Sequence, residues 1–122
     1  MSLLRERLRE ILDSNSTRDL VEPLEHLLEK LIVELRPLKV IITGSLAKGR
    51  FVRGLSDIDM LVIVDYEVSC DKRFILTSVK DVDVEITVIS TLELERALQE
   101  NREFYVDTLK HGVVVFTTEN TS

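Results

Sequence analysis

The stretch KVIITGSLAKGRFVRGLSDIDMLVIVD, residues 39–65, contains two apolar runs separated by a polar loop. The first run, residues 39–43, is short and β-branched, as expected of a buried strand, and Pro37 ends the helical pattern before it. Gly44 and Ser45 then turn the chain, and residues 45–49 can form one helical turn. The second run, residues 57–65, predicts another strand with a buried end.

Two carboxylates stand at the start of this second run. Asp57 and Asp59 are two residues apart on a predicted strand, so their side chains share one face, while Ile58 and Met60 point to the other. Two carboxylates held so close repel each other, an arrangement usually tolerated where a divalent cation neutralises them. Because all the ligands are oxygens, Mg²⁺ or Mn²⁺ fits better than zinc. Such a pair alone is more often a polar strand end.

The loop before these carboxylates suits an anion. Gly44 and Ser45 follow directly on a buried strand and open a short helical turn, which leaves backbone N–H groups and a hydroxyl available to a phosphate. Lys48, Arg50 and Arg53 crowd the same loop and can reach a polyphosphate, although each can equally be ordinary surface charge. The sequence therefore predicts an anionic substrate beside a cation site.

The flanking segments predict an α/β (α+β) domain with a small mixed sheet and helices packed against it. Apolar spacing predicts helices over residues 3–13 and from about 19 to 36. Residues 73–79 and 82–90 read as an antiparallel hairpin whose tip is Lys80-Asp81. A helix capped by Thr91 and stopped by Gly112 then leads to a last strand, residues 113–116. The inward side chains predicted for this helix are Leu94, Ala97, Leu98, Tyr105 and Leu109.

We expect one domain over residues 1–122, made of N-terminal helices (1–36), a core (37–92) and a C-terminal helix and strand (93–118), with order throughout except in residues 119–122. The single cysteine, Cys70, excludes an internal disulfide, and no apolar run is long enough to span a membrane. These features predict a cytoplasmic protein. With 22 acidic against 16 basic residues and a net charge of -6, the chain is not expected to bind nucleic acid unaided.

The hairpin offers a third carboxylate. Asp83 and Glu85 share one face of the second hairpin strand, and either can complete a three-carboxylate site with Asp57 and Asp59. Strand pairing alone does not choose between them, and both can simply form the wet face of a hairpin. A third acid matters because transfer with two metals needs ligands for both ions and a base near the attacking hydroxyl.

These motifs resemble the nucleotidyltransferases of the DNA polymerase β superfamily, whose signature is GS, a spacer, SDxD and a later acid on a neighbouring strand. Here the signature is Gly44-Ser45, ten residues (46–55), then Ser56-Asp57-Ile58-Asp59. The sub-pattern is similar to that of archaeal-type CCA-adding enzymes, and the length is similar to that of stand-alone minimal nucleotidyltransferases. The resemblance covers residues 37–92 well and the N-terminal helices least.

The resemblance implies the following roles. Asp57 and Asp59 would bind two Mg²⁺ ions, and Gly44 and Ser45 would hold the triphosphate of an NTP substrate, with Lys48 and Ser56 as further nucleotide-binding candidates. The segment VEITVIST matches the family pattern around the third acid with Glu85, and Asp83 is the second choice. Many family members have aspartate where this chain has glutamate.

The expected activity is Mg²⁺-dependent transfer of a nucleoside monophosphate, AMP from ATP in the first place, to a hydroxyl of an unknown acceptor with release of pyrophosphate. Minimal members often work with a small helical protein of the HEPN type, in some cases as a toxin-antitoxin pair. The alternative is therefore an antitoxin-like module that covers such a partner, with or without catalysis. The leucine stripes of the first two helices are core residues first, but can also form a homodimer or partner surface.

Overall fold

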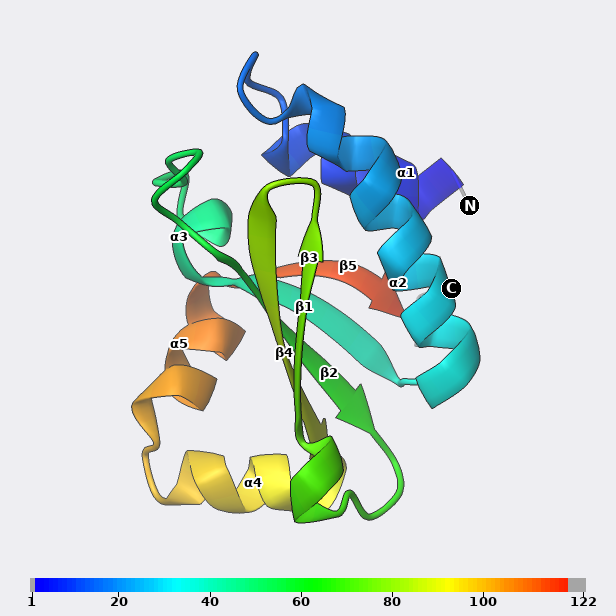
Figure 1. Cartoon of the computed structure of the whole chain (residues 1–122). Coiled ribbons are helices and arrows are strands. Elements are labelled where there is room, and N and C mark those ends of the chain that lie inside the picture. Colours follow the sequence, from blue (N-terminus) through cyan, green and yellow to red (C-terminus); the bar gives the residue numbers. More distant parts are fainter. Residues whose placement is uncertain (1, 119–122) are drawn as a thin grey trace.

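The computed structural model describes residues 2–118 as a sheet with helices on both faces (Figure 1). The mixed sheet and packed helices confirm the predicted fold class, and the predicted tail, residues 119–122, lies outside the described residues. No helix in the described part is long and apolar enough to cross a membrane. The helices are α1 (Ser2–Ile11), α2 (Val21–Leu35), α3 (Gly44–Ala47), α4 (Thr91–Gln99) and α5 (Glu103–His111), with short 3-10 turns η1 (Arg18–Leu20) and η2 (Cys70–Lys72).

The five strands are β1 (Lys39–Thr43), β2 (Ile58–Val64), β3 (Phe74–Val79), β4 (Val82–Ser90) and β5 (Val113–Thr117). Their order across the sheet is β3-β4-β2-β1-β5. β2 and β4 are parallel, whereas the other neighbouring pairs are antiparallel, which confirms the predicted hairpin. The predicted strands therefore all exist, with boundaries that differ by a residue or two.

The sheet is buried on both faces in its centre, because α1 and α2 cover one face and α4 and α5 cover part of the other (Figure 1). On the first face, Met60, Val62 and Val64 of β2 pack with the leucines of α1 and α2. On the second face, Leu61 and Ile63 pack with Ala97 of α4 and Tyr105 of α5. Burial on both sides explains why β2 is an almost unbroken apolar run rather than an alternating one.

The predicted C-terminal helix is wrong in one respect, because two helices occupy its place. α4 ends at Gln99, and Asn101 adopts a left-handed backbone with φ of 55° before α5 begins at Glu103. Asparagine tolerates this conformation better than most residues, so the break is locally encoded. The cap is Ser90 rather than Thr91, since the Ser90 hydroxyl accepts a hydrogen bond from the Glu93 N–H at 3.1 Å.

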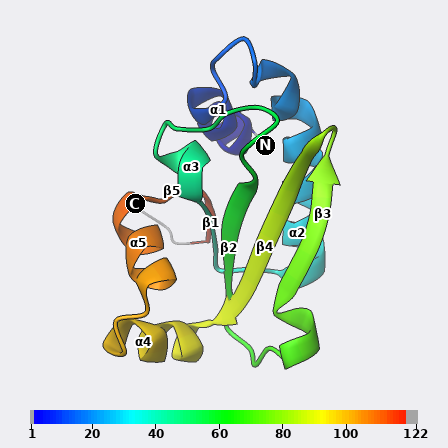
Figure 2. The ribbon, with the colours of Figure 1, turned by 60° about the vertical axis from the view of Figure 1, so that its left-hand side comes forward.

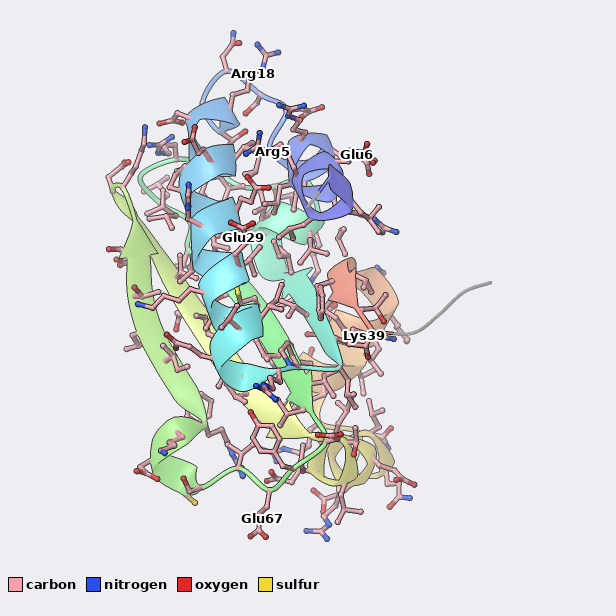
Figure 3. The ribbon with its side chains drawn as sticks, turned by 90° about the vertical axis from the view of Figure 1, so that its right-hand side faces the viewer. Arg5, Glu6, Arg18, Glu29, Lys39 and Glu67 are labelled. Atoms are coloured by element: carbon pink, nitrogen blue, oxygen red, sulfur yellow. The ribbon has the colours of Figure 1, made fainter. Side chains whose placement is uncertain are left out.

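One other expectation about the helices needs correction, and one buried residue was not predicted. Leu109 was expected to face inward on a single helix, but the change of direction at Asn101 leaves it 47% exposed. Glu25 falls inside a leucine-rich helix, yet its side chain is buried at 4% exposure. Its Oε1 accepts a hydrogen bond from Arg5 Nε at 2.9 Å, and Figure 3 shows Arg5 between α1 and α2. This ion pair joins the first two helices.

We expect Arg5→Met to lower the midpoint of thermal unfolding by several degrees at neutral pH. The substitution leaves a buried carboxylate without its guanidinium, and the apolar stem of methionine replaces that of arginine. Hydrogen bonding to Arg5 lowers the pKa of Glu25 in the folded protein. The stabilisation is therefore complete above the ordinary carboxyl pKa and is lost as the pH falls through the lowered value.

Thermal unfolding followed by circular dichroism at a series of pH values measures this effect. Arg9→Met, one turn further along the exposed side of α1, is the matched control for losing a surface arginine. The destabilisation by Arg5→Met relative to this control should shrink as the solution becomes acid. An equal loss at every pH would show that the guanidinium acts through packing and not through Glu25.

Candidate active site

Asp57 and Asp59 lie at the beginning of β2, on the side of the sheet that carries α4 and α5. β2 starts at Ile58, so Asp57 immediately precedes the strand and is exposed, while Asp59 is its second residue and is half-buried. Ile58 and Met60 are fully buried on the opposite face, as the alternation predicts. Burial raises the pKa of the Asp59 carboxyl, a hydrogen bond with Glu85 partly offsets this, and the charge of Asp57 adds to it.

Glu85 joins these two aspartates from the neighbouring strand. In the parallel pair of β2 and β4, Asp59 is directly opposite Glu85. Hydrogen bonding to Asp57 and the charge of Asp59 raise the pKa of the Glu85 carboxyl, which shows that the three side chains converge. Asp83 lies two residues before Glu85, toward the hairpin tip, on the same face and opposite Ser78. The register therefore places Glu85, and not Asp83, directly opposite Asp59.

The three carboxylates approach one another without forming a finished coordination shell. Within residues 2–118, no three His, Cys, Asp or Glu side chains are arranged in the way that holds a metal ion. Asp57 and Asp59 both raise the pKa of the Glu85 carboxyl, which places the three carboxylates close together. Carboxylates this close together repel one another less when one of them binds a proton or when a cation binds between them.

Gly44 brings the GS turn against Asp59. α3 begins at Gly44, directly after β1, and Figure 2 shows it beside the beginning of β2 with β4 on the other side. Gly44 has a φ of +70°, and a Cβ built there would lie 2.5 Å from Asp59 Oδ2. Only glycine allows this approach. Ser45 follows it within α3, whose Leu46 is buried in the core and fixes the turn.

Two predicted phosphate-binding side chains have partners within the fold. Lys48 forms an ion pair with Asp107 of α5 at 2.9 Å, and both line a polar hollow of about 360 Å³ with Arg50 and His111. The Ser56 hydroxyl accepts a hydrogen bond from the Val52 N–H at 3.0 Å, so it closes the loop before β2. Lys48 would have to leave Asp107 to reach a phosphate, whereas the Ser56 hydroxyl keeps its O–H as a donor while it accepts from Val52.

Arg53 was expected as a cation for the polyphosphate, but the structure uses it to hold the loop. Its guanidinium pairs with Asp19 at 2.8 Å and with Asp81 at 2.6 Å, and Nη1 also donates to the Ser16 carbonyl at 2.6 Å. Hydrogen bonding to Arg53 lowers the pKa of Asp19 to about 2. The loop between α3 and β2 is thereby tied to η1 and to the hairpin tip. No local pattern indicates these partners, because they are distant along the chain.

We expect Arg53→Ala to accelerate amide hydrogen exchange in residues 48–57 by about tenfold or more, since the substitution removes three contacts that fix one loop. Arg53→Lys should restore little of the protection, because an ammonium group cannot make the same forked contacts. Hydrogen exchange measured by mass spectrometry tests this, with Arg50→Ala in the same loop as the control. Equal protection in Arg53→Ala and the wild type would show that the ion pairs contribute nothing to loop order.

Two hollows border the carboxylates on the open surface of the hairpin. The first, of about 400 Å³, is lined by Asp57, Leu76, Asp83 and Glu85 among others. The second, of about 150 Å³, is bordered by Asp59, Glu85 and Leu76 and also by Phe74 and Phe104. The second hollow lies beside the first turn of α5, since Phe104 belongs to that helix. Sequence reasoning did not find Phe74, Leu76 or Phe104, although the hairpin register places the first two beside Glu85.

Comparison with known proteins identifies the family of this domain. The family model described as "Nucleotidyltransferase domain" matches residues 24–117 of the 122-residue chain. A search of curated proteins gave no match. The matched segment includes β1, the GS turn, both aspartates, the hairpin and β5. The chain therefore belongs to the nucleotidyltransferase domain family.

Proposed function

We propose that this protein transfers a nucleoside monophosphate from an NTP, with ATP as the first candidate, to a hydroxyl group and releases pyrophosphate. Membership of the family supports nucleotidyl transfer in general. The observation that carries the proposal is the convergence of Asp57, Asp59 and Glu85 directly beside the close-packed Gly44. Three carboxylates next to a turn that exposes backbone N–H groups form a suitable site for a cation-bound polyphosphate.

The donor set fits Mg²⁺. Asp57, Asp59 and Glu85 supply only carboxylate oxygens, and Mg²⁺ prefers hard oxygen ligands. Burial of Asp59 and hydrogen bonding of Glu85 to Asp57 raise the pKa values of these two acids, and a bound divalent cation would lower them. These three residues would hold the metal, with Asp83 next in line. When bound, Mg²⁺ neutralises phosphate charge and favours departure of pyrophosphate.

The protein residues position the reacting groups around this site. The backbone N–H groups of Gly44 and Ser45, at the beginning of α3, would bind the β- and γ-phosphates. Because Gly44 has no Cβ, the turn can lie against Asp59. Glu85 lies on the side of Asp59 away from β1, since β2 separates β1 from β4. Its carboxylate is therefore placed to accept the proton of the attacking hydroxyl.

Isothermal titration of the purified protein with a non-hydrolysable ATP analogue, with and without Mg²⁺, tests the nucleotide site. Metal-dependent binding that disappears in Asp57→Ala/Asp59→Ala supports the proposal. Binding that persists unchanged in the double variant, or no binding of any NTP analogue, contradicts it. The predicted HEPN-type partner and the predicted homodimer remain predictions, and size-exclusion chromatography with light scattering measures the second directly.

A further inference from the structure

Helix α5 is fixed to the strand that leads into the GS turn. The hydroxyls of Thr108 and Thr43 are hydrogen-bonded at 3.1 Å, and both residues are buried. Thr43 immediately precedes Gly44. Just after α5, Gly112 packs so closely on β1 that a Cβ there would lie 2.5 Å from Ile41 Cγ2. Close packing and a buried hydrogen bond therefore determine the position of α5 relative to the GS turn.

Asp107, next to Thr108 on this helix, forms an ion pair with Lys48. Lys48 Nζ lies 2.9 Å from Asp107 Oδ2, and the two side chains are 29% and 33% exposed. In Figures 1 and 2, α5 and α3 lie on the same side of the sheet, and Lys48 directly follows α3. Asp107 has a short side chain on a fixed helix, whereas the lysine ammonium is carried on four flexible carbons. When the pair opens, Lys48 is therefore the partner that moves.

Lys48 is placed to reach the proposed phosphate site. Its N–H donates a hydrogen bond to the Gly44 carbonyl at 3.2 Å, so the two residues are one helical turn apart. In a helix the Cα–Cβ bond tilts toward the N-terminus, so Lys48 projects back toward the beginning of α3. Under the proposed function, the β- and γ-phosphates lie there. The triphosphate and Asp107 therefore attract the same ammonium group.

A second cation lies beside Asp107. The polar hollow of about 360 Å³ is lined by Arg50 as well as by Lys48, Asp107 and His111. None of the carboxylates in residues 2–118 forms an ion pair with Arg50. Hydrogen bonding to Lys48 lowers the pKa of the Asp107 carboxyl, and the charge of Arg50 adds to this. Arg50 can therefore neutralise Asp107 when Lys48 turns away.

We propose that Asp107 sets the affinity of the active site for the NTP by competing with the triphosphate for Lys48, and that Arg50 replaces Lys48 beside Asp107 when the nucleotide binds. This inference rests on the proposed function and concerns regulation of the same site. Because Lys48 must leave an ion pair, the loss of that pair offsets part of its attraction to the phosphates. Asp107 is thus a positioning residue, which acts through Lys48 and does not touch the nucleotide.

Isothermal titration with the non-hydrolysable ATP analogue and Mg²⁺ measures the competition in the wild type, Asp107→Asn, Lys48→Met and the double variant. We expect Asp107→Asn to tighten binding about threefold or more, since Lys48 no longer has to leave a partly buried ion pair. Lys48→Met should weaken binding, and Asp107→Asn should then have no effect on the Lys48→Met protein. Unchanged affinity in either single variant overturns the proposal. An equal gain with and without Lys48 also overturns it, because Asp107 would then merely repel the phosphates.

Two controls separate the ion pair from the general charge of α5. Glu103→Gln removes an exposed carboxylate one turn before Asp107 and should leave the affinity unchanged. Asp107→Glu keeps the negative charge and should bind the analogue almost as the wild type does. A gain in affinity with Glu103→Gln as large as that with Asp107→Asn would contradict a specific role of Asp107.

The role of Arg50 has an effect of opposite sign. Arg50→Gln should weaken binding about twofold or more in the wild type, because Asp107 then keeps Lys48 more firmly. The same change should have no effect in the Asp107→Asn protein. In NMR spectra, the Cε signals of Lys48 and the Nε–H signal of Arg50 should shift with one saturation curve as the analogue is added. An Arg50 signal that does not move, or equal weakening in both proteins, overturns the exchange of cations.

Failure of this inference differs from failure of the proposed function. If the analogue binds the wild type with Mg²⁺ and not Asp57→Ala/Asp59→Ala, but Asp107→Asn changes nothing, only the competition for Lys48 is excluded. If no nucleotide analogue binds the wild type under any condition, the proposed function fails, and this inference fails with it.

Discussion

Replacing Asp59 with asparagine should slow nucleotidyl transfer about a thousandfold or more and, in the same protein, raise the midpoint of thermal unfolding by several degrees. The loss of rate follows because the neutral amide of asparagine lacks the negative charge of the carboxylate and therefore binds a divalent cation poorly. The gain in stability follows because Asp59 is half-buried and its pKa is raised, so its ionisation opposes folding. Release of pyrophosphate and differential scanning calorimetry measure the two effects.

The stabilising effect of Asp59→Asn depends on pH in a direction that follows from the pKa shifts. Asp59 and Glu85 both have raised pKa values in the folded protein, so the folded state binds protons more tightly than the unfolded state. Their contribution to stability is therefore greatest below the ordinary carboxyl pKa and is lost as the pH rises through the raised values. The stabilising effect of Asp59→Asn should be largest at neutral pH and should vanish in acid.

Asp83→Asn is the control for removing one carboxylate from the same face of the sheet. Asp83 is exposed and lies two residues before Glu85, opposite Ser78 of β3. We therefore expect its replacement to change both rate and stability less than replacement of Asp59 does. Mg²⁺ should raise the unfolding midpoint of the wild type and of Asp83→Asn, but not that of Asp59→Asn. An Asp59→Asn protein that transferred at the wild-type rate would remove Asp59 from the active site.

Replacing Gly44 with alanine should lower the rate of nucleotidyl transfer about a hundredfold or more, because a displacement of about 1 Å in an active site has this effect. A Cβ at this position lies 2.5 Å from Asp59 Oδ2, so either the carboxylate or the turn must move. The φ of +70° adds a backbone cost of about 1–2 kcal/mol for any residue with a side chain. Transfer rate and denaturant unfolding measure these two contributions.

Gly49 separates the backbone cost from the contact with Asp59. Its φ of +72° is nearly that of Gly44, but a Cβ there meets nothing within 4 Å. Gly49→Ala should therefore lose a similar amount of stability and keep most of the activity. If both alanine variants lost activity equally, the contact between Gly44 and Asp59 would not be the cause.

Much of this fold could be predicted because local signals agree with the tertiary structure. The two-residue tip Lys80-Asp81 indicates the hairpin, and the run of residues 57–65 indicates a strand with a buried end, which the structure extends to burial on both faces. The alternation in DID correctly placed Ile58 inside and Asp59 on the other face. Strand alternation also placed Glu85 and Asp83 on the same face of their strand. Only the parallel pairing of β4 with β2 shows that Glu85 lies opposite Asp59.

The features that escaped prediction depend on partners distant along the chain. Arg53 carried only a positive charge in the sequence, and its three acceptors come from residues 16, 19 and 81. Glu25 is buried because Arg5 of another helix reaches it. Phe74 and Leu76 alternate with partly buried residues as any edge strand does, and only the position of α4 and α5 determines that their face stays open.

The place of β5 has a consequence for synthesis of the protein. β1 lies between β2 and β5, so its second edge is paired only with residues 113–117, at the end of the described chain. While the ribosome is still making these residues, β1 presents free N–H and C=O groups on an apolar strand. The nascent chain can then add a strand from a neighbouring molecule in place of its own. Chaperone binding during translation would protect this protein until β5 is complete.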